Sequence, residues 1–258
     1  HSWKKNHRSW HVLKHHYILL IITKMTNSLP SEFSISIILI GLVLGQGCSS
    51  EKDDHVKTSL NVKKENEPTC RILILGDSIT EGYGVSQHQA FPALLERKLN
   101  HEFPSSPHAT YKVINAGISG STTSGGVSRI EWLLKSNPDY LIIALGGNDG
   151  LRGVPVIETK NNLEKIILAA KEKDIPLLLA GMKIPPNYGD NYTRKFSHLF
   201  KDLAKEQGVD LLPFLLEGVG GDPSMNLPDR IHPNPAGHQK ISNTVFEALV
   251  QHLPSKIQ

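Results

Sequence analysis

Four short polar strings hold side chains that could perform nucleophilic chemistry. In chain order they are Gly76-Asp77-Ser78, Asn115-Ala116-Gly117, Gly146-Gly147-Asn148-Asp149 and Asp229-Arg230-Ile231-His232-Pro233-Asn234. A serine hydroxyl becomes a nucleophile when a histidine accepts its proton and a carboxylate fixes the tautomer of that histidine. Ser78 is the candidate nucleophile and His232 the candidate base. Asp229 precedes His232 by three residues and can reach its other ring nitrogen through a local turn, so the sequence predicts a Ser78, Asp229, His232 triad.

The same strings contain candidate donors for the negative charge that develops on the attacked oxygen. The backbone N–H groups of Ser78 and Gly117 and the side-chain amide of Asn148 are expected to supply three such donors. Gly117 suits this role because a residue without a side chain lets the backbone approach a substrate closely. Each string alone is an ordinary turn or helix cap, and only their joint occurrence favours catalysis.

Regular alternation of apolar runs and amphipathic segments predicts the elements that position these strings. Strands are expected at Ile72–Leu75, Tyr111–Asn115, Tyr140–Leu145, Pro176–Ala180 and about Asp210–Leu212, with helices near 91–99, 127–134, 163–170, 192–207 and after Pro235. This alternation predicts an α/β fold with a central parallel sheet of about five strands and helices on both faces. The polar strings follow the strands, so they should meet at the carboxyl edge of the sheet. Trp132, beside Leu133 and Leu134, is expected in the core.

Composition excludes several classes of protein. The chain has 258 residues and only two cysteines, which excludes a disulfide-rich scaffold. The net charge of +3 arises from residues 1–24, which carry five basic residues and no acidic one, while the remainder holds 23 basic and 25 acidic residues. The body of the chain therefore lacks the basic excess of a nucleic-acid-binding protein, and no nucleic-acid partner is expected.

The first seventy residues divide into three segments before a domain at 71–258. Residues 1–24 precede the first methionine, Met25, and are interpreted as upstream or artificially added sequence. Residues 25–48 form a signal-like segment, whose apolar run from Phe33 to Gly45 is too short for a membrane span but suits a signal peptide. Residues 49–70 form a polar linker.

The end of the signal-like segment resembles a bacterial lipoprotein signal. The apolar run is followed by Gly47-Cys48-Ser49-Ser50 and then by the hydrophilic linker. This order predicts an exported protein, periplasmic or membrane-anchored through a lipid on Cys48, which would associate with a membrane surface. Ordinary secretion with cleavage nearby is the alternative, and a Cys48–Cys70 disulfide remains open if Cys48 carries no lipid.

From Arg71 to about Leu253 the sequence resembles the GDSL or SGNH hydrolases, in particular the thioesterase I/lysophospholipase and arylesterase-like branch. The resemblance is carried by the four strings and by Pro186-Asn187-Tyr188-Gly189 and Leu211-Leu212-Pro213-Phe214. It implies a three-layer flavodoxin-like fold, Ser78 as nucleophile with Asp229 and His232, an oxyanion hole from Ser78, Gly117 and Asn148, and no metal or organic cofactor. Ile79, where Leu is more usual, and Arg230 inside Asp-x-x-His depart from the family pattern.

Rival motifs fail on their spacing. Gly76-Asp77-Ser78-Ile79-Thr80 lacks the last glycine of the α/β-hydrolase elbow, and Gly82-Tyr83-Gly84-Val85-Ser86-Gln87 ends in Gln where a dinucleotide fingerprint has Gly. The glycine-rich stretch from Gly117 to Gly126 contains no Gly-Lys-[Ser/Thr]. H-E-x-x-H and paired C-x-x-C motifs are also absent from the sequence, which leaves no recognisable metal-ligand set.

The sequence therefore predicts a serine esterase that acts on small acyl esters, thioesters or lysolipids through an acyl-enzyme on Ser78. The substrate slot is expected between the loops Gly147–Pro155 and Lys183–Asp190, where Leu151, Val154 and Ile184 either line an acyl channel or pack the loop bases. Two alternatives are a carbohydrate O-acetyl esterase with the same triad and a non-catalytic surface lipoprotein. The intact set of polar residues disfavours the second, because a binding role does not need it.

Overall fold

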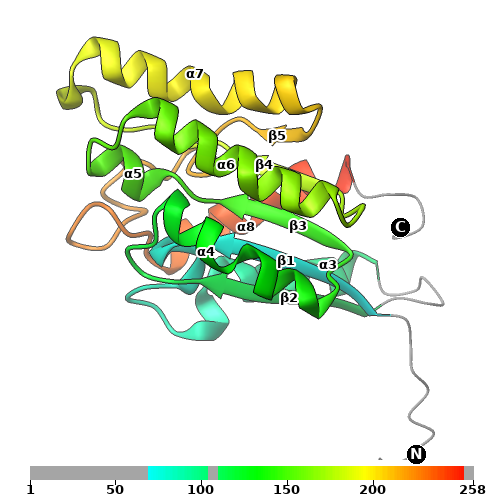
Figure 1. The fold of residues 1–258 in the computed structure, drawn as a ribbon. Helices are drawn as coiled ribbons and strands as arrows, with labels where there is room; N and C mark the ends of the chain where they lie inside the picture. The colour runs from blue at the N-terminus through cyan, green and yellow to red at the C-terminus, as the bar shows by residue number, and fades with distance from the viewer. Residues whose placement is uncertain (1–68, 104–109, 253–258) are drawn as a thin grey trace, which may run out of the picture. The chain divides into compact units, whose positions relative to one another are not determined.

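A parallel sheet of five strands lies at the centre of the protein in a computed structural model that describes residues 69–103 and 110–252 (Figure 1). These residues belong to one unit of the chain, Lys63–Gln258. The strands are β1 (Thr69–Gly76), β2 (Thr110–Gly117), β3 (Tyr140–Ala144), β4 (Leu177–Ala180) and β5 (Asp210–Leu212). Their order in the sheet is β2-β1-β3-β4-β5, which is the flavodoxin-like order. The predicted α/β fold class is confirmed.

Helices cover both faces of the sheet. Packed on one face are α4 (Thr123–Leu133), α6 (Val156–Lys171) and α7 (Asp190–Gln207), and on the other α3 (Phe91–Glu102) and α8 (Pro235–Val250) (Figure 1). Short helices lie in the connections: α2 (Ser78–Glu81), η1 (Gln87–Gln89), η2 (Leu134–Ser136), α5 (Gly147–Leu151) and η3 (Pro186–Tyr188). Three layers result, as expected for strands joined by helical crossovers.

The core lies between the sheet and the helices. Every residue of β3 and β4 is buried, because helices cover both faces of these central strands. Burial of their apolar side chains is the main favourable term for a sheet of this kind. The carboxyl ends of the strands emerge at the left edge in Figure 1 and carry the loops that hold the polar strings.

Trp132 does not lie in the core, contrary to the sequence-based expectation. Its side chain is 70% exposed on α4. The helix begins at Thr123 and buries Thr123, Gly126 and Ile130, which recur at helical spacing on one face. Two residues beyond Ile130, Trp132 is turned by about 200° and points away from the sheet.

The predictions for the N-terminal segments fall on residues outside the described part of the chain. These are the upstream segment 1–24, the signal-like segment 25–48 and lipidation of Cys48. Cys70, at the start of β1, is a buried free thiol, and burial raises its pKa to about 12. None of the helices within 69–103 and 110–252 has the length and apolar character needed to cross a membrane.

His238 on α8 is fully buried and links the helices on one face of the sheet. Its Nδ1 accepts a hydrogen bond of 3.2 Å from the backbone N–H of Phe91 at the start of α3, while Nε2 has no partner among the described residues. Burial, with a smaller contribution from His232, lowers the pKa of His238 to about 4. At pH values between about 4 and 6.5, the imidazole is therefore neutral in the folded protein and protonated in the unfolded chain.

As the pH falls from about 6.5 to 4, we expect the free energy of unfolding of the wild type to decrease relative to that of His238→Gln. Above pH 6.5 the imidazole is neutral in both states. Below pH 6.5 the unfolded chain binds a proton at His238 and the folded chain does not, which lowers the free energy of unfolding by up to about 3 kcal/mol near pH 4. Urea unfolding at several pH values measures the effect. Asp77, whose pKa burial raises to about 6, acts in the opposite direction in both proteins and cancels in the comparison.

The matched control is His101→Gln, because the side chain of His101 is 84% exposed on α3. This variant should follow the wild type at every pH. Parallel curves for wild type and His238→Gln would show that burial of His238 does not govern acid stability.

Candidate active site

Ser78 is the first residue of α2, directly after β1. Asp77 caps this helix by accepting the N–H of Ile79 at 3.0 Å. The sharp change from strand to helix places Ser78 at the carboxyl edge of the sheet with 8% of its surface exposed. Its backbone N–H has no hydrogen-bond partner within the described ranges, as is typical of the first residues of a helix.

His232 lies against Ser78 although 154 residues separate them in the chain. The Ser78 Oγ to His232 Nε2 distance is 3.0 Å, and His232 Nδ1 lies 2.8 Å from Asp229 Oδ2. With Nδ1–H donating to Asp229, Nε2 carries the lone pair that accepts the hydroxyl proton of Ser78. The structure thus brings together all three residues of the predicted triad.

A tight turn holds Asp229 in place for this contact. Asp229 Oδ1 accepts the backbone N–H groups of Ile231 and His232, both at 2.9 Å, and Arg230 between them has a φ of +59°. These two hydrogen bonds, followed by the contact with His232, lower the pKa of Asp229 to about 2. Asp229 is therefore an anion over the whole working pH range, which suits a group that orients an imidazole.

Asn148 lies in α5, next to Asp77 and to the turn after β2. Its Nδ2 donates to Asp77 Oδ2 and to the carbonyl of Ser121, both at the long distance of 3.2 Å. Its neighbour Asp149 is buried and accepts the N–H of Thr123 at 2.9 Å, which ties α5 to the start of α4. The amide is thereby held beside the residue that precedes the candidate nucleophile.

Gly117 does not fulfil the expectation for an oxyanion donor. Its N–H already donates to Asn115 Oδ1 at 2.9 Å. The glycine packs against α2 so closely that a Cβ atom would lie 2.1 Å from the backbone nitrogen of Glu81. Gly117 is therefore required for close packing of two backbones rather than for an approach to substrate.

Gly120, which the sequence analysis missed, offers a backbone donor instead. Residues 118–121 form a turn closed by the Ser121 N–H to Ile118 carbonyl bond of 3.0 Å, and Gly120 within it has a φ of +74°. Its N–H makes no hydrogen bond in the described part of the chain, and the next residue, Ser121, contacts Asn148. The available sequence signal was the string Ser119-Gly120-Ser121, whose residue types are typical of a turn.

Arg129 on α4 fixes the strand ends beneath these groups, and sequence reasoning also missed it. One of its terminal nitrogens donates to the carbonyl of Gly76 at 2.8 Å and the other to the carbonyl of Ala116 at 2.5 Å. Desolvation lowers the pKa of its guanidinium. A single side chain therefore sets the spacing between the ends of β1 and β2.

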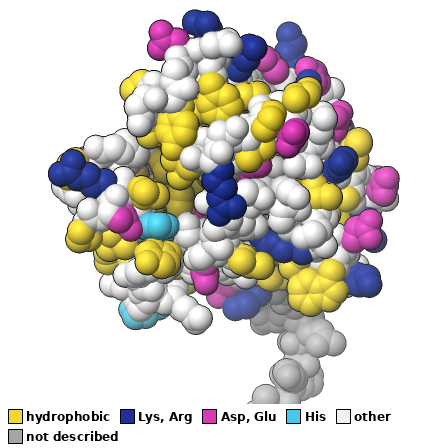
Figure 2. All heavy atoms as spheres, turned by 60° about the vertical axis from the view of Figure 1, so that its left-hand side comes forward, with side chains coloured by type: hydrophobic (Ala, Val, Ile, Leu, Met, Phe, Trp, Pro, Cys, Tyr) yellow, Lys and Arg dark blue, Asp and Glu magenta, His cyan; other side chains and the backbone are white. Residues whose placement is uncertain are grey.

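The two loops of the expected substrate slot contact each other. Tyr188 Oη donates to the carbonyl of Leu151 at 2.9 Å, and Tyr192 Oη to that of Val154 at 2.6 Å. Ile184 is buried beneath Gly150, whereas Leu151 is 38% exposed. Of the two roles left open for these side chains, Ile184 therefore packs the loop base. Figure 2 shows the carboxyl-edge face, where hydrophobic side chains border a hollow beside an exposed histidine.

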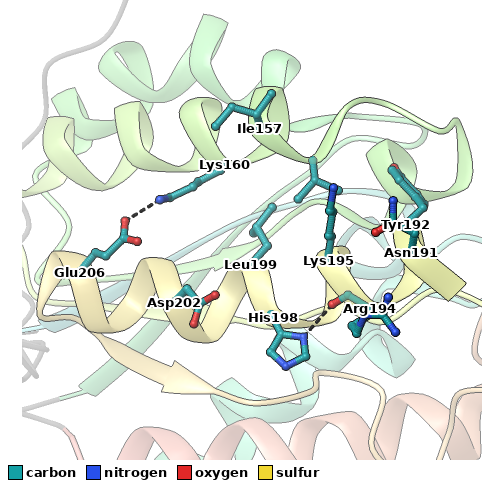
Figure 3. Close-up of a pocket in the computed structure, with 11 residues that line it drawn as sticks. Ile157, Lys160, Asn191, Tyr192, Arg194, Lys195, His198, Leu199, Asp202 and Glu206 are labelled. Atoms are coloured by element: carbon teal, nitrogen blue, oxygen red, sulfur yellow. Dashed lines mark hydrogen bonds and ion pairs between the residues drawn. The ribbon is translucent and has the colours of Figure 1, made fainter.

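A separate groove of about 670 Å³ runs between α6 and α7 (Figure 3). Its apolar lining comes from Val156 and Ile157 of α6 and from Tyr192 and Leu199 of α7, and Lys160 pairs with Glu206 across it at 2.6 Å. None of the triad residues lines it. Within the described residues, no three His, Cys, Asp or Glu side chains converge so as to hold a metal ion.

Comparison with known proteins gives a consistent result. Residues 74–240 match the model of the GDSL-like lipase/acylhydrolase family. Esterase TesA of Pseudomonas aeruginosa is 38% identical over 179 residues, which cover 69% of this chain and 87% of that protein. Thioesterase 1/protease 1/lysophospholipase L1 of Escherichia coli K12 is 41% identical over 164 residues, or 63% of this chain and 75% of that protein. A crystal structure of TesA matches with a TM-score of 0.67 at 38% identity, covering 71% of this chain and 99% of the other.

We expect Asn148→Ala to reduce kcat about a hundred- to a thousandfold with a small effect on KM, because an oxyanion donor acts mainly in the transition state. Steady-state hydrolysis of p-nitrophenyl butyrate measures both constants. Asn191→Ala, an exposed asparagine on α7, is the matched control and should behave as the wild type. A loss expressed mainly in KM would assign Asn148 to ground-state binding instead.

Proposed function

The chain belongs to the GDSL-like lipase/acylhydrolase family and is a serine esterase, and on that premise we propose that it cleaves small esters and thioesters through an acyl-enzyme on Ser78. The observation that carries the proposal is the chain of contacts from Ser78 Oγ to His232 Nε2 at 3.0 Å and from His232 Nδ1 to Asp229 at 2.8 Å. This is the arrangement that activates a serine hydroxyl.

Acylation begins when Ser78 Oγ attacks the substrate carbonyl and His232 Nε2 takes the hydroxyl proton. The tetrahedral oxyanion receives hydrogen bonds from the N–H groups of Ser78 and Gly120 and from Asn148, which must exchange one of its present acceptors. Collapse breaks the bond to the alcohol or thiol, which leaves with the proton from His232. Asp229 keeps its negative charge throughout and stabilises the imidazolium.

Deacylation repeats these steps with water as the nucleophile. His232 removes a proton from water, the hydroxide adds to the acyl carbonyl, and the second tetrahedral intermediate releases the carboxylic acid. Ser78 regains its proton from His232. Both half-reactions therefore use the same oxyanion donors and the same base, and at the end of the cycle Ser78 and His232 have regained their original protonation states.

We expect Ser78→Ala to lower kcat/KM for p-nitrophenyl butyrate at least about a thousandfold, because the covalent route is lost while binding is kept. The assay uses the full chain in detergent, with Ser128→Ala, an exposed serine on α4, as the matched control. An alkylphosphonate p-nitrophenyl ester should add one covalent phosphonyl adduct to the wild type with release of p-nitrophenol, and peptide mass analysis should locate the adduct at Ser78. Equal rates in wild type and Ser78→Ala would place the chemistry elsewhere.

We also propose export and lipidation at Cys48, supported by the apolar run from Phe33 to Gly45 and the Gly47-Cys48-Ser49-Ser50 string. A lipidated cysteine would hold the esterase at a membrane surface, where esters of lysolipid type are accessible. Metabolic labelling of a bacterial host with an alkyne fatty acid should mark the wild type and leave Cys48→Ser unmarked. Release of an unlabelled, cleaved wild-type protein would support ordinary secretion.

A further inference from the structure

Tyr83 lies against the catalytic imidazole, and no step of the hydrolysis above uses it. The centroids of the Tyr83 and His232 rings are 4.4 Å apart, with their planes inclined by 40°. Tyr83 is 52% exposed. Core burial therefore does not account for its position, and among the described aromatic contacts its ring meets that of His232 alone.

The backbone of Tyr83 is anchored to the nucleophile. Its N–H donates to the carbonyl of Ser78 at 3.0 Å, and Gly82, with a φ of +91°, reverses the chain at the end of α2. A left-handed residue at this point lets the chain return over the site that it has just left. One residue thus contacts the backbone of Ser78 and the side chain of His232.

The contact continues into the neighbouring residue. A Cβ atom on Gly84 would lie 2.4 Å from Leu227 Cδ1, and the N–H of Leu227 donates to the carbonyl of His232 at 2.7 Å. The loop after α2 is therefore packed against the turn that carries His232 at two adjacent points. Its position relative to the imidazole is fixed by more than a single side-chain rotamer.

The hydrogen bonds of His232 leave one degree of freedom that Tyr83 can restrict. Asp229 and Ser78 hold the two nitrogens on the edge of the imidazole, which fixes where the nitrogens lie. Tilting of the ring about the line through those nitrogens is then opposed only by the covalent bond to Cβ. An aromatic ring whose centroid lies 4.4 Å away restricts that tilt further.

The negative potential of the Tyr83 ring face is complementary to the positive charge that develops on His232. When His232 takes the proton from Ser78, the imidazole becomes a cation, and the face of an aromatic ring attracts a cation. The other titratable or charged groups near His232 are Asp229, hydrogen-bonded to it, the buried Asp77 and His238, and Arg230 on the same turn. A change at position 83 leaves all of these in place.

We propose, on the premise of the proposed hydrolysis, that Tyr83 is a positioning residue whose ring face aligns the His232 imidazole with Ser78 and stabilises its protonated form. The hydroxyl of Tyr83 has no role in this proposal, since it makes no hydrogen bond within the described residues. The effect belongs to the general base and is therefore shared by all substrates whose leaving groups depart without a proton from His232.

The test compares Tyr83→Phe, which keeps the ring, with Tyr83→Leu, which removes it. We expect Tyr83→Phe to stay within about twofold of the wild type, and Tyr83→Leu to lose about three- to tenfold in kcat with little change in KM. The acid limb of the kcat/KM profile of Tyr83→Leu should move to lower pH by about half a unit, because the imidazolium loses a stabilising contact.

Two further measurements separate this role from packing or substrate contact. Phenylalanine analogues with increasing fluorination at position 83 keep the shape of the ring but weaken the negative potential of its face. The acid limb of the kcat/KM profile should therefore move further to lower pH with each added fluorine. Rates with p-nitrophenyl butyrate and S-(4-nitrophenyl) thiobutyrate, whose leaving groups both depart as anions, should fall by equal factors. The matched control is Trp132→Leu, an exposed aromatic remote from the site on α4, which should change neither rate nor profile.

Each outcome decides the question. A stationary or raised acid limb, or fluorinated rings that behave as phenylalanine, would overturn the electrostatic role, and unequal losses for the two substrates would assign Tyr83 to leaving-group contact. If Tyr83→Leu does not fold, the fluorinated series alone answers the question. Failure of the proposed function appears separately, as wild-type activity that does not depend on Ser78.

Discussion

The hydrogen bond between Ser78 Oγ and His232 Nε2 is the constraint on which the rest of the site depends, because it joins residues 154 positions apart. Ser78 is placed by β1, a central strand of the sheet. His232 lies in an irregular turn, and the start of α8 directly after this turn fixes its position. Asn234 caps α8 by accepting the N–H of Gly237 at 3.0 Å, and His238 in the same helix accepts the N–H of Phe91 from α3. The helical layer on one face of the sheet thus determines where the base lies, and a buried neutral histidine that costs acid stability serves this purpose.

Two carboxyl groups of the site, Asp229 and Asp77, have pKa values shifted in opposite directions, and each direction has a local cause. Asp229 accepts two backbone N–H groups and the imidazole, which lowers its pKa to about 2. Asp77 is buried, and although Ile79 and Asn148 donate to it, desolvation raises its pKa to about 6. The first is a permanent anion suited to orient a base that becomes charged. Asp77 caps α2 and accepts a hydrogen bond from Asn148, so its main role is to hold these groups in place in the free enzyme.

Much of the fold and most of the site could be predicted because they depend on local patterns. Apolar runs mark the strands, and parallel strands with helical crossovers bring their carboxyl ends to one edge, which is enough to gather Ser78, Asn148 and His232. Gly117 shows where such reasoning fails, since the availability of a backbone N–H depends on whether a neighbouring side chain, here Asn115, turns back to accept it. The prediction that Trp132 lies in the core was wrong for a related reason, because the residue at which a helix begins determines which face of the helix is buried. Tyr83 and Arg129 act through contacts between distant segments, and no local pattern reports them.

The candidate oxyanion donors differ in how they are kept ready. The N–H groups of Ser78 and Gly120 have no partner among the described residues, so a substrate oxygen would meet them without displacing any protein group. Asn148 instead has two acceptors at 3.2 Å, longer than an optimal N–H to oxygen bond. An amide held by two weak bonds keeps its position in the free enzyme yet can exchange one of them for a developing negative charge, which binds it more strongly. Differential binding of this kind favours the transition state over the substrate. The weak contacts of Asn148 with Asp77 and Ser121 are thus consistent with catalysis, because tighter ones would compete with the charge that the site has to stabilise.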